Sequence, residues 1–288
     1  MIDVHASYDA PTGTVTYLVV SGREAVLIDP ILDYDAAGAV ITTDSVDKVL
    51  TQAQALGVRV THVLETHVHA DHLSAGDHVR HVTGASVAIG SRIVEVQATF
   101  RDLFGMAAED ANEGAFDILL DDGDTLTFGD ATIAVLHTPG HTPACVSYLI
   151  DGVAFVGDTL FMPDFGTART DFPGGDAASL YQSIQKILAL PDETVLYVGH
   201  DYPSDARPEP SWRTTVRDQK AANIHVGANA DEAAFVAMRE ARDATLSQPK
   251  LILPALQVNI RAGALPPPEA GGRRYFKLPI TFAPDREA

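Results

Sequence analysis

Short apolar runs, bounded by turn-forming glycine, proline or aspartate residues, alternate with amphipathic stretches over roughly the first 205 residues. The apolar runs predict strands at 15–20, 25–28, 58–64, 85–89, 125–128, 131–136, 144–150, 153–156 and 194–198. Apolar residues at helical spacing predict helices at 44–56, 74–82, 91–104 and 177–190. This mixture of strands and helices is typical of an α/β (α+β) protein.

The pattern changes after residue 200. Two helical stretches, 211–223 and 231–246, lead into a proline-rich tail that contains Pro249, Pro254 and the run 266–268. No repeat or low-complexity tract interrupts the chain. We therefore expect one main domain, residues 1–205, and a C-terminal helical and Pro-rich extension, residues 206–288, that packs on the same domain.

Composition narrows the class of protein. Hydrophobic residues make up 46% of the 288 and charged residues 20%, as in soluble globular proteins. The net charge of −19 argues against nucleic acid or an anionic membrane surface as the main partner, because both select basic patches. Cys145 is the single cysteine, which excludes an intramolecular disulfide and a Cys-rich zinc site. With no export signal or membrane-length apolar run, we expect a cytoplasmic protein.

The segment 66–72 carries the strongest chemical signal. It holds three imidazoles and one carboxylate in six positions, directly after the predicted strand 58–64. Imidazole is the commonest metal ligand, and buried histidines without a metal would carry an uncompensated desolvation cost. The segment therefore predicts a metal site built from His67, His69, Asp71 and His72.

Three later strands end in the same way. His141 follows strand 131–136, Asp158 follows strand 153–156, and each lies beside a glycine. His200, also beside a glycine, follows strand 194–198. Because strand ends at one edge of a sheet lie close together, these side chains are expected to join the first cluster.

The four segments, in this order and together with the strand that ends at Asp29, resemble the metallo-β-lactamase superfamily. They are the H-x-H-x-D-H run and the later P-G-H-T, G-D-T and G-H-D segments, and the resemblance covers roughly residues 13–202. It implies an αββα sandwich with a metal site at one edge, between the two sheets.

Four segments resemble the persulfide dioxygenases, the ETHE-type sulfur dioxygenases. They are Glu-Thr-His-Val-His-Ala-Asp-His at 65–72, Ala-Arg-Thr-Asp-Phe at 168–172, Gly-His-Asp-Tyr at 199–202, and Pro-Ala-Leu-Gln-Val-Asn-Ile-Arg-Ala-Gly at 254–263. The resemblance implies that glutathione persulfide and O₂ are converted to sulfite and glutathione at one Fe(II). By family correspondence the iron ligands would be His67, His141 and Asp158, two imidazoles and one carboxylate.

The resemblance gives the other residues supporting roles. Those that would orient the ligands or donate hydrogen bonds near the metal are His69, Asp71, His72, His200 and Tyr202. Asp29 is expected to position the 67–72 loop rather than bind metal. Arg169 and Arg261 are the candidates for clamping glutathione carboxylates, since arginine forks match that geometry. A homodimer is common in the resembling family.

Other chemistries use the same ligands. A dinuclear zinc thioester hydrolase of the glyoxalase II type would add His69, Asp71, His72 and His200 as ligands, and its two metals would activate a bridging hydroxide. The basic C-terminal glutathione-binding motif associated with those hydrolases is absent. A secreted β-lactam hydrolase is disfavoured by the missing export signal, and a non-catalytic persulfide or metal sensor by the intact ligand set.

Overall fold

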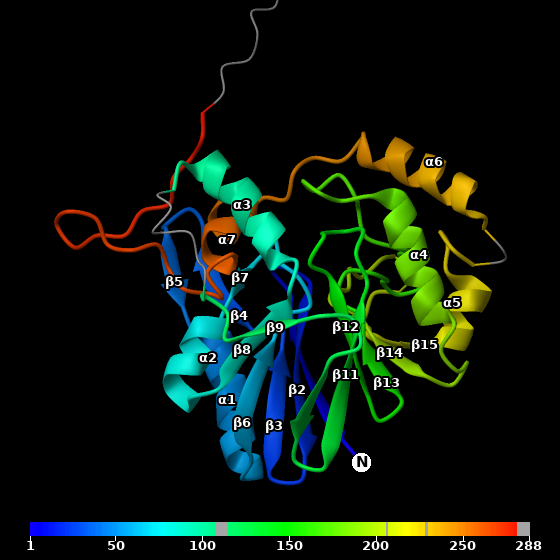
Figure 1. The fold of residues 1–288 in the computed structure, drawn as a ribbon, viewed down its shortest axis with the longest axis horizontal. Helices are drawn as coiled ribbons and strands as arrows, with labels where there is room; N and C mark the ends of the chain where they lie inside the picture. Colours follow the sequence, from blue (N-terminus) through cyan, green and yellow to red (C-terminus); the bar gives the residue numbers. More distant parts are fainter. Residues whose placement is uncertain (107–113, 206, 228–229, 281–288) are drawn as a thin grey trace, which may run out of the picture.

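Two six-stranded sheets stack face to face, and helices cover their outer faces (Figure 1). The computed structural model describes residues 1–106, 114–205, 207–227 and 230–280. This αββα arrangement confirms the predicted fold class. The strands predicted in residues 1–200 are present, and β1, the short β4, β5, β7 and β9 are additional to them.

The first sheet brings two polar chain segments side by side. Its order is β1 (Asp3–Asp9), β2 (Thr14–Ser21), β3 (Glu24–Ile28), β6 (Arg59–Leu64), β8 (Ser86–Gly90) and β9 (Ile118–Leu120). β3 and β6 are parallel, with Ile28 opposite Leu64. Asp29 and Glu65 therefore leave neighbouring strands at the same edge of the sheet.

The second sheet also brings two polar chain segments side by side. Its order is β10 (Thr125–Phe128), β11 (Ala131–His137), β12 (Val146–Ile150), β13 (Val153–Phe155), β14 (Val195–Tyr197) and β15 (Arg213–Thr215). β13 and β14 are parallel, with Phe155 opposite Tyr197. The segments that carry Asp158 and His200 follow these two strands and emerge at one edge.

Helices and a small third sheet complete the layers. The first sheet is covered by α1 (Asp44–Leu56), α2 (Gly76–Thr83), α3 (Ile93–Phe104) and α7 (Ile252–Asn259), and the second by α4 (Ala177–Leu188), α5 (Val216–Ala222) and α6 (Glu232–Asp243). The third sheet joins β4 (Ile31–Asp35), β5 (Val40–Thr42) and β7 (Leu73–Ser74). None of the helices in the described ranges is long and apolar enough to cross a membrane.

Apolar side chains from both sheets form the central core. Those that meet between the sheets include Val15, Tyr17, Ile28, Leu64, Ile133, Val135, Tyr148 and Phe155. A second cluster lies between the first sheet and its helices, and a third lies between the second sheet and α4 to α6. The alternating burial of β11, for example, follows from one face packing on this core.

The C-terminal part of the chain differs most from the prediction. Residues 213–215, predicted to be helical, form β15, which suits the two β-branched threonines, and Thr215 then caps α5. The proline-rich stretch contains α7, in which Pro254 lies in the first turn, where the helix has no partner for a backbone N–H. Residues 206, 228–229 and 281–288 of the predicted extension lie outside the described residues.

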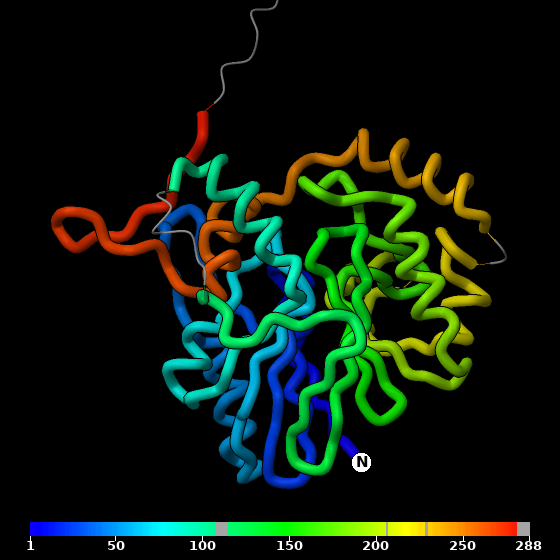
Figure 2. The backbone as a smooth tube through the Cα atoms, viewed as in Figure 1, coloured from blue at the N-terminus to red at the C-terminus, as the bar shows by residue number. Residues whose placement is uncertain are grey.

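The extension spans both layers of the sandwich. Figure 2 shows that the chain runs from α6, beside α4, across the top of the molecule to α7 on the other side. α7 packs against β7 and α3. The C-terminal segment thus contacts elements of both layers.

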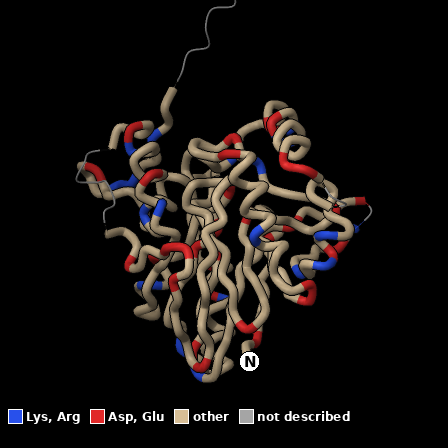
Figure 3. The backbone as a smooth tube through the Cα atoms, turned by 45° about the vertical axis from the view of Figure 1, so that its right-hand side comes forward, with Lys and Arg blue, Asp and Glu red and all other residues tan. Residues whose placement is uncertain are grey.

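Charged residues are distributed over all these elements. Figure 3 shows positions of acidic residues on many loops and helices. This is the expected appearance of a chain with 39 acidic and 20 basic residues.

Two buried tyrosines tie the sheets together beside the edge that carries the polar loops. Tyr17 of β2 donates to the carbonyl of Val198, which follows β14 in the other sheet, at 2.6 Å. Tyr148 of β12 donates to the carbonyl of Glu65, which follows β6, at 2.8 Å. Burial raises the pKa of both hydroxyls well above the usual value, so both stay protonated donors.

We expect Tyr17→Phe and Tyr148→Phe each to lower the free energy of unfolding by about 1–3 kcal/mol, because each leaves a buried carbonyl without its donor. Urea denaturation measures the change. Tyr275→Phe is the control, since that side chain is 51% exposed and should alter stability negligibly. Equal stability of all three variants would contradict a role for the two cross-sheet bonds.

Candidate metal centre

The polar loops meet where the two sheets end. Residues 65–72 follow β6, 138–141 follow β11, 157–158 follow β13 and 199–200 follow β14. The structure brings all seven predicted ligand residues into two adjoining groups. The histidines among them are at most 7% exposed, so the groups lie largely out of water.

The first group consists of His67, His141 and Asp158. One ligand atom from each lies within 4.8 Å of the others. Asp158 Oδ2 is 3.8 Å from His67 Nε2 and 3.9 Å from His141 Nε2. Two imidazoles and one carboxylate that face a common point form the donor set of many non-haem Fe(II) sites.

The second group consists of His69, Asp71, His72 and His200 and meets the same 4.8 Å criterion. His200 Nε2 lies 3.4 Å from Asp71 Oδ2 and also 3.4 Å from Asp158 Oδ1. Asp158 therefore directs one oxygen to each group. The chain has donors for one metal ion at the first group and for another at the second.

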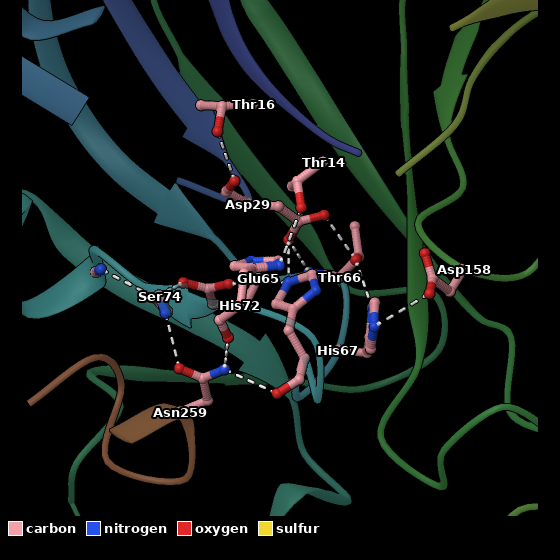
Figure 4. A network of polar contacts seen from close by, with 12 residues as sticks. Thr14, Thr16, Asp29, Glu65, Thr66, His67, His72, Ser74, Asp158 and Asn259 are labelled. Carbon is pink, nitrogen blue, oxygen red and sulfur yellow. Dashed lines mark hydrogen bonds and ion pairs between the residues drawn. The ribbon is translucent and has the colours of Figure 1, made fainter. Parts of the chain in front are cut away.

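Hydrogen bonds fix the ring orientation of both histidines in the first group. Thr66 Oγ1 donates to Asp29 Oδ2 at 2.8 Å, so it accepts from His67 Nδ1 at 3.0 Å (Figure 4). His141 Nδ1 donates to the carbonyl of Arg169 at 2.8 Å, since a carbonyl can only accept. Both rings thus carry hydrogen on Nδ1 and present the lone pair of Nε2, as a metal ligand requires.

Asp29 has a second partner. Its Oδ1 accepts from the Thr66 backbone N–H at 2.7 Å and lies 3.1 Å from His69 Nε2. Glu65 Oε2 approaches the same nitrogen at 3.3 Å. Burial alone would lower the pKa of His69, but the two carboxylates raise it well above the usual value. The His69 ring is thus held from its Nε2 side by two buried carboxylates.

Unpaired buried atoms support a metal at this site. Among the described residues, Nε2 of His67, His72 and His200 and Oδ1 of Asp158 are buried without a hydrogen-bond partner. Unpaired buried polar atoms are rare because each costs about 1–3 kcal/mol. Burial and the neighbouring imidazoles lower the pKa of His67 well below its usual value, so this ring is neutral and can donate its lone pair. The residues present therefore fit a metal ion.

Helix α6 supports the His141 side of the centre. Asp243 accepts from the backbone N–H of Thr170 at 2.8 Å and pairs with Arg239 at 2.7 Å. Arg239 also donates to the carbonyl of Thr167 at 3.2 Å. This buried pair holds the segment on both sides of Arg169, whose carbonyl orients His141.

A cavity of about 690 Å³ opens onto the first group. His141 and Asp158 lie in its wall, together with aromatic and cationic side chains. The lining includes Asp71, Phe161, Phe165, Tyr202, Arg169, Arg239, Arg242 and Lys250. A ligand in this cavity would share it with two residues of the first group and with several positively charged side chains.

Three predicted residues have specific environments. Tyr202 lines the cavity and stacks on the His200 ring, with planes 5° apart. Arg169 also lines it, but its guanidinium pairs with both oxygens of Asp171, at 2.5 and 2.6 Å. The structure does not bring Arg261 to this cavity: it is 9% exposed and donates to the carbonyl of Gln257.

Besides the buried Arg239, two exposed cations that were not predicted line the cavity. Arg242 lies in the last turn of α6 and Lys250 in the following loop. Within the described part of the chain, neither side chain has an acceptor at ion-pair or hydrogen-bond distance. No local pattern distinguishes them from other surface cations, so only the folded chain identifies them.

Comparison with known proteins supports the metal centre. A family model described as the metallo-beta-lactamase superfamily matches residues 9–200. The chain is 50% identical to a probable metallo-hydrolase of Burkholderia pseudomallei, over 96% of this chain and 98% of that protein. It is 47% identical to the beta-lactamase hydrolase-like protein of Xylella fastidiosa, over 96% of this chain, and spans 64% of that protein's length.

Two further similarities concern persulfide dioxygenases. The chain is 30% identical to human persulfide dioxygenase ETHE1, over 88% of this chain and 86% of that protein. It is similar to the crystal structure of ETHE1 from Myxococcus xanthus, with 31% identity and a TM-score of 0.73, over 91% of this chain and 100% of that one.

We expect Thr66→Val to weaken metal binding by about 10–100-fold, because it removes the hydroxyl that orients His67 and links it to Asp29. Competition with a chelator, using Co(II) or Fe(II), measures the affinity. Thr66→Ser keeps the hydroxyl and should retain most of the binding. Unchanged affinity in Thr66→Val would show that this link does not support the centre.

Proposed function

The chain belongs to the metallo-β-lactamase superfamily, and we propose that it is a persulfide dioxygenase with one Fe(II) per chain. The reaction consumes glutathione persulfide, O₂ and water and yields glutathione, sulfite and two protons. The terminal sulfur is oxidised, O₂ is the oxidant, and the sulfur–sulfur bond is broken.

The first group carries this proposal. His67, His141 and Asp158 supply two imidazoles and one carboxylate, a set that leaves coordination positions open on Fe(II). Bound Fe(II) would bring the persulfide and O₂ together and mediate the electron transfer between them. The protein's part is to orient the ligands through Thr66 and the Arg169 carbonyl, and to keep the ion largely out of bulk water.

The second group then has a supporting role. His69, Asp71, His72 and His200 adjoin the first group, and Asp71 pairs with both His72 and His200. Asp29 and Glu65 both contact Nε2 of His69, which fixes the His69 ring next to His67. Such neighbours set ligand orientation and the charge of the site.

The cavity supports a thiol carrier with negative charge. Glutathione has two carboxylates, and the exposed cations Arg242 and Lys250 in the lining would receive them. Arg169, already paired with Asp171, would contribute through its remaining N–H groups. The persulfide end would extend past Phe161 and Tyr202 toward Asp158. A cytoplasmic location and a homodimer remain predictions that accompany this function.

The alternative is a dinuclear zinc thioester hydrolase. The second group favours it, because Asp158 directs its Oδ1 toward His200 and all four donors lie within 4.8 Å of one another. Two zinc ions, one at each group, would hold a hydroxide for attack on a thioester carbonyl. The name of the Burkholderia relative, a probable metallo-hydrolase, is compatible with this reaction.

Metal content and activity separate the two functions. We expect the purified protein, reconstituted under anaerobic conditions, to retain one iron per chain and to consume O₂ with glutathione persulfide, measured with an oxygen electrode. Lactoyl-glutathione hydrolysis should be negligible in the same preparation. Two zinc ions per chain with thioester hydrolysis and no O₂ uptake would reject the dioxygenase.

Removing positive charge from the cavity lining tests whether the substrate is an anionic thiol carrier. We expect Arg242→Gln combined with Lys250→Gln to raise KM for glutathione persulfide by about tenfold with little change in kcat, because these groups bind a part of the substrate that does not react. The effect should shrink at high ionic strength. Arg23→Gln, in the exposed turn between β2 and β3, is the control for loss of charge. An equal KM in both variants would exclude this cationic pair from substrate binding.

A further inference from the structure

Asn259, the last residue of α7, reaches the histidine-rich turn from the opposite end of the sequence. Its Nδ2 donates to the carbonyl of His69 at 2.8 Å and to the carbonyl of His72 at 2.7 Å. Its Oδ1 accepts from the backbone N–H of Ser74 at 2.7 Å. Figure 4 shows this amide below the turn, on the side away from Asp158.

The chemistry of the contact requires an amide. The turn presents two carbonyl acceptors and one N–H donor, and the side chain that meets them is 4% exposed. Only a carboxamide offers two donors and one acceptor in this space. An aspartate would accept from Ser74 but would place its second oxygen against the two carbonyls, with no water to separate them.

The amide is held by a closely packed backbone. A Cβ added to Gly263 would lie 2.8 Å from the carbonyl oxygen of Ser74, and one added to Gly76 would lie 2.8 Å from that of Ala262. The end of α7 and the segment after the turn are thus in backbone-to-backbone contact. Gln97 of α3 donates to the carbonyl of Ile260 at 2.8 Å and fixes the same end of α7.

The two carbonyls that Asn259 binds enclose the part of the turn that carries Asp71 and His72. The His69 ring in turn packs against His67, with ring centroids 4.0 Å apart. A change in the path of the 69–74 backbone would therefore move side chains of both groups. Side chains such as Thr66 and Asp29 each orient one imidazole ring, whereas Asn259 binds the backbone that carries His69, Asp71 and His72.

We propose that Asn259 is a positioning residue of the metal centre, which makes α7 of the C-terminal segment part of that centre. The inference rests on the proposed metal site but not on the reaction catalysed there. It holds for one metal ion or for two, because the turn carries residues of both groups.

The same helix supplies a matched control. Gln257 is also a buried amide of α7 with two donated bonds and one accepted bond: it donates to the carbonyls of Leu253 and Lys277 and accepts from the Lys277 N–H. Leu253 lies in α7 and Lys277 lies in the C-terminal segment after α7, so neither partner belongs to the histidine-rich turn. Gln257→Ala should thus lower stability about as much as Asn259→Ala but leave the centre intact.

The experiment measures metal affinity and stability of the full-length chain. We expect Asn259→Ala to bind Co(II) at least tenfold more weakly in competition with a chelator, and Gln257→Ala to stay within twofold of the wild type. The visible absorption of the Co(II) protein should change in Asn259→Ala and not in Gln257→Ala. Thermal unfolding of the metal-free proteins checks that the two substitutions cost similar stability.

Equal affinities in the two variants, whether both unchanged or both reduced, would overturn the proposal. If Asn259→Ala does not fold, Asn259→Ser and Asn259→Asp are compared in its place, and wild-type affinity in both would overturn it as well. The result is independent of the reaction. A wild-type protein that binds zinc and hydrolyses thioesters would reject the dioxygenase and leave the role of Asn259 to be decided by the affinities.

Discussion

The burial of many ionisable groups at one edge of the sandwich is the constraint on which the rest of the structure depends. Five imidazoles and the carboxylates of Asp29, Glu65, Asp71 and Asp158 lie within a few ångströms of one another, largely out of water. Each would be costly to bury alone, because a charge loses its hydration in a medium of low polarity. Together they offset one another only if each donor meets the correct acceptor.

Only some of these buried donors and acceptors have hydrogen-bond partners within the protein. Both oxygens of Asp29 accept from Thr66, and Glu65 Oε1 accepts from Ser74, so part of this inner layer is paired without a metal. Among the described residues, the buried atoms left without hydrogen bonds include Nε2 of His67 and Oδ1 of Asp158, and also Glu65 Oε2 and both ring nitrogens of His69. The paired carboxylate oxygens fix the loop, and the unpaired atoms of the two ligand groups point to where a cation would be held. The difference between paired and unpaired atoms explains why one short loop can contain both metal ligands and residues that orient them.

Much of this site could be predicted because strand ends impose it. His67, His141 and Asp158 each lie three or four residues after a strand, and these strands end at the same edge of the sandwich. The C-terminal contributions could not be predicted in this way. Asn259 reaches the turn through packing of α7, and Arg242 reaches the cavity because α6 lies against α4. Such placement depends on tertiary packing, for which no local spacing gives a signal. Cys145, just before β12, is buried, and burial raises the pKa of its thiol to about 12.

A site between two sheets needs connections that stop the sheets from moving relative to each other. The tyrosines Tyr17 and Tyr148 provide two of them within the core, directly beneath the metal loops. The C-terminal segment provides two more connections. On the side of the second sheet, Asp243 of α6 binds the backbone N–H of Thr170, next to the carbonyl that orients His141. On the side of the first sheet, Asn259 of α7 binds the turn that follows His67. Because one continuous chain joins α6 to α7 across the top, the geometry of each ligand group depends on the same peripheral segment. The metal centre is therefore a property of the whole chain and not of the histidine-rich loop alone.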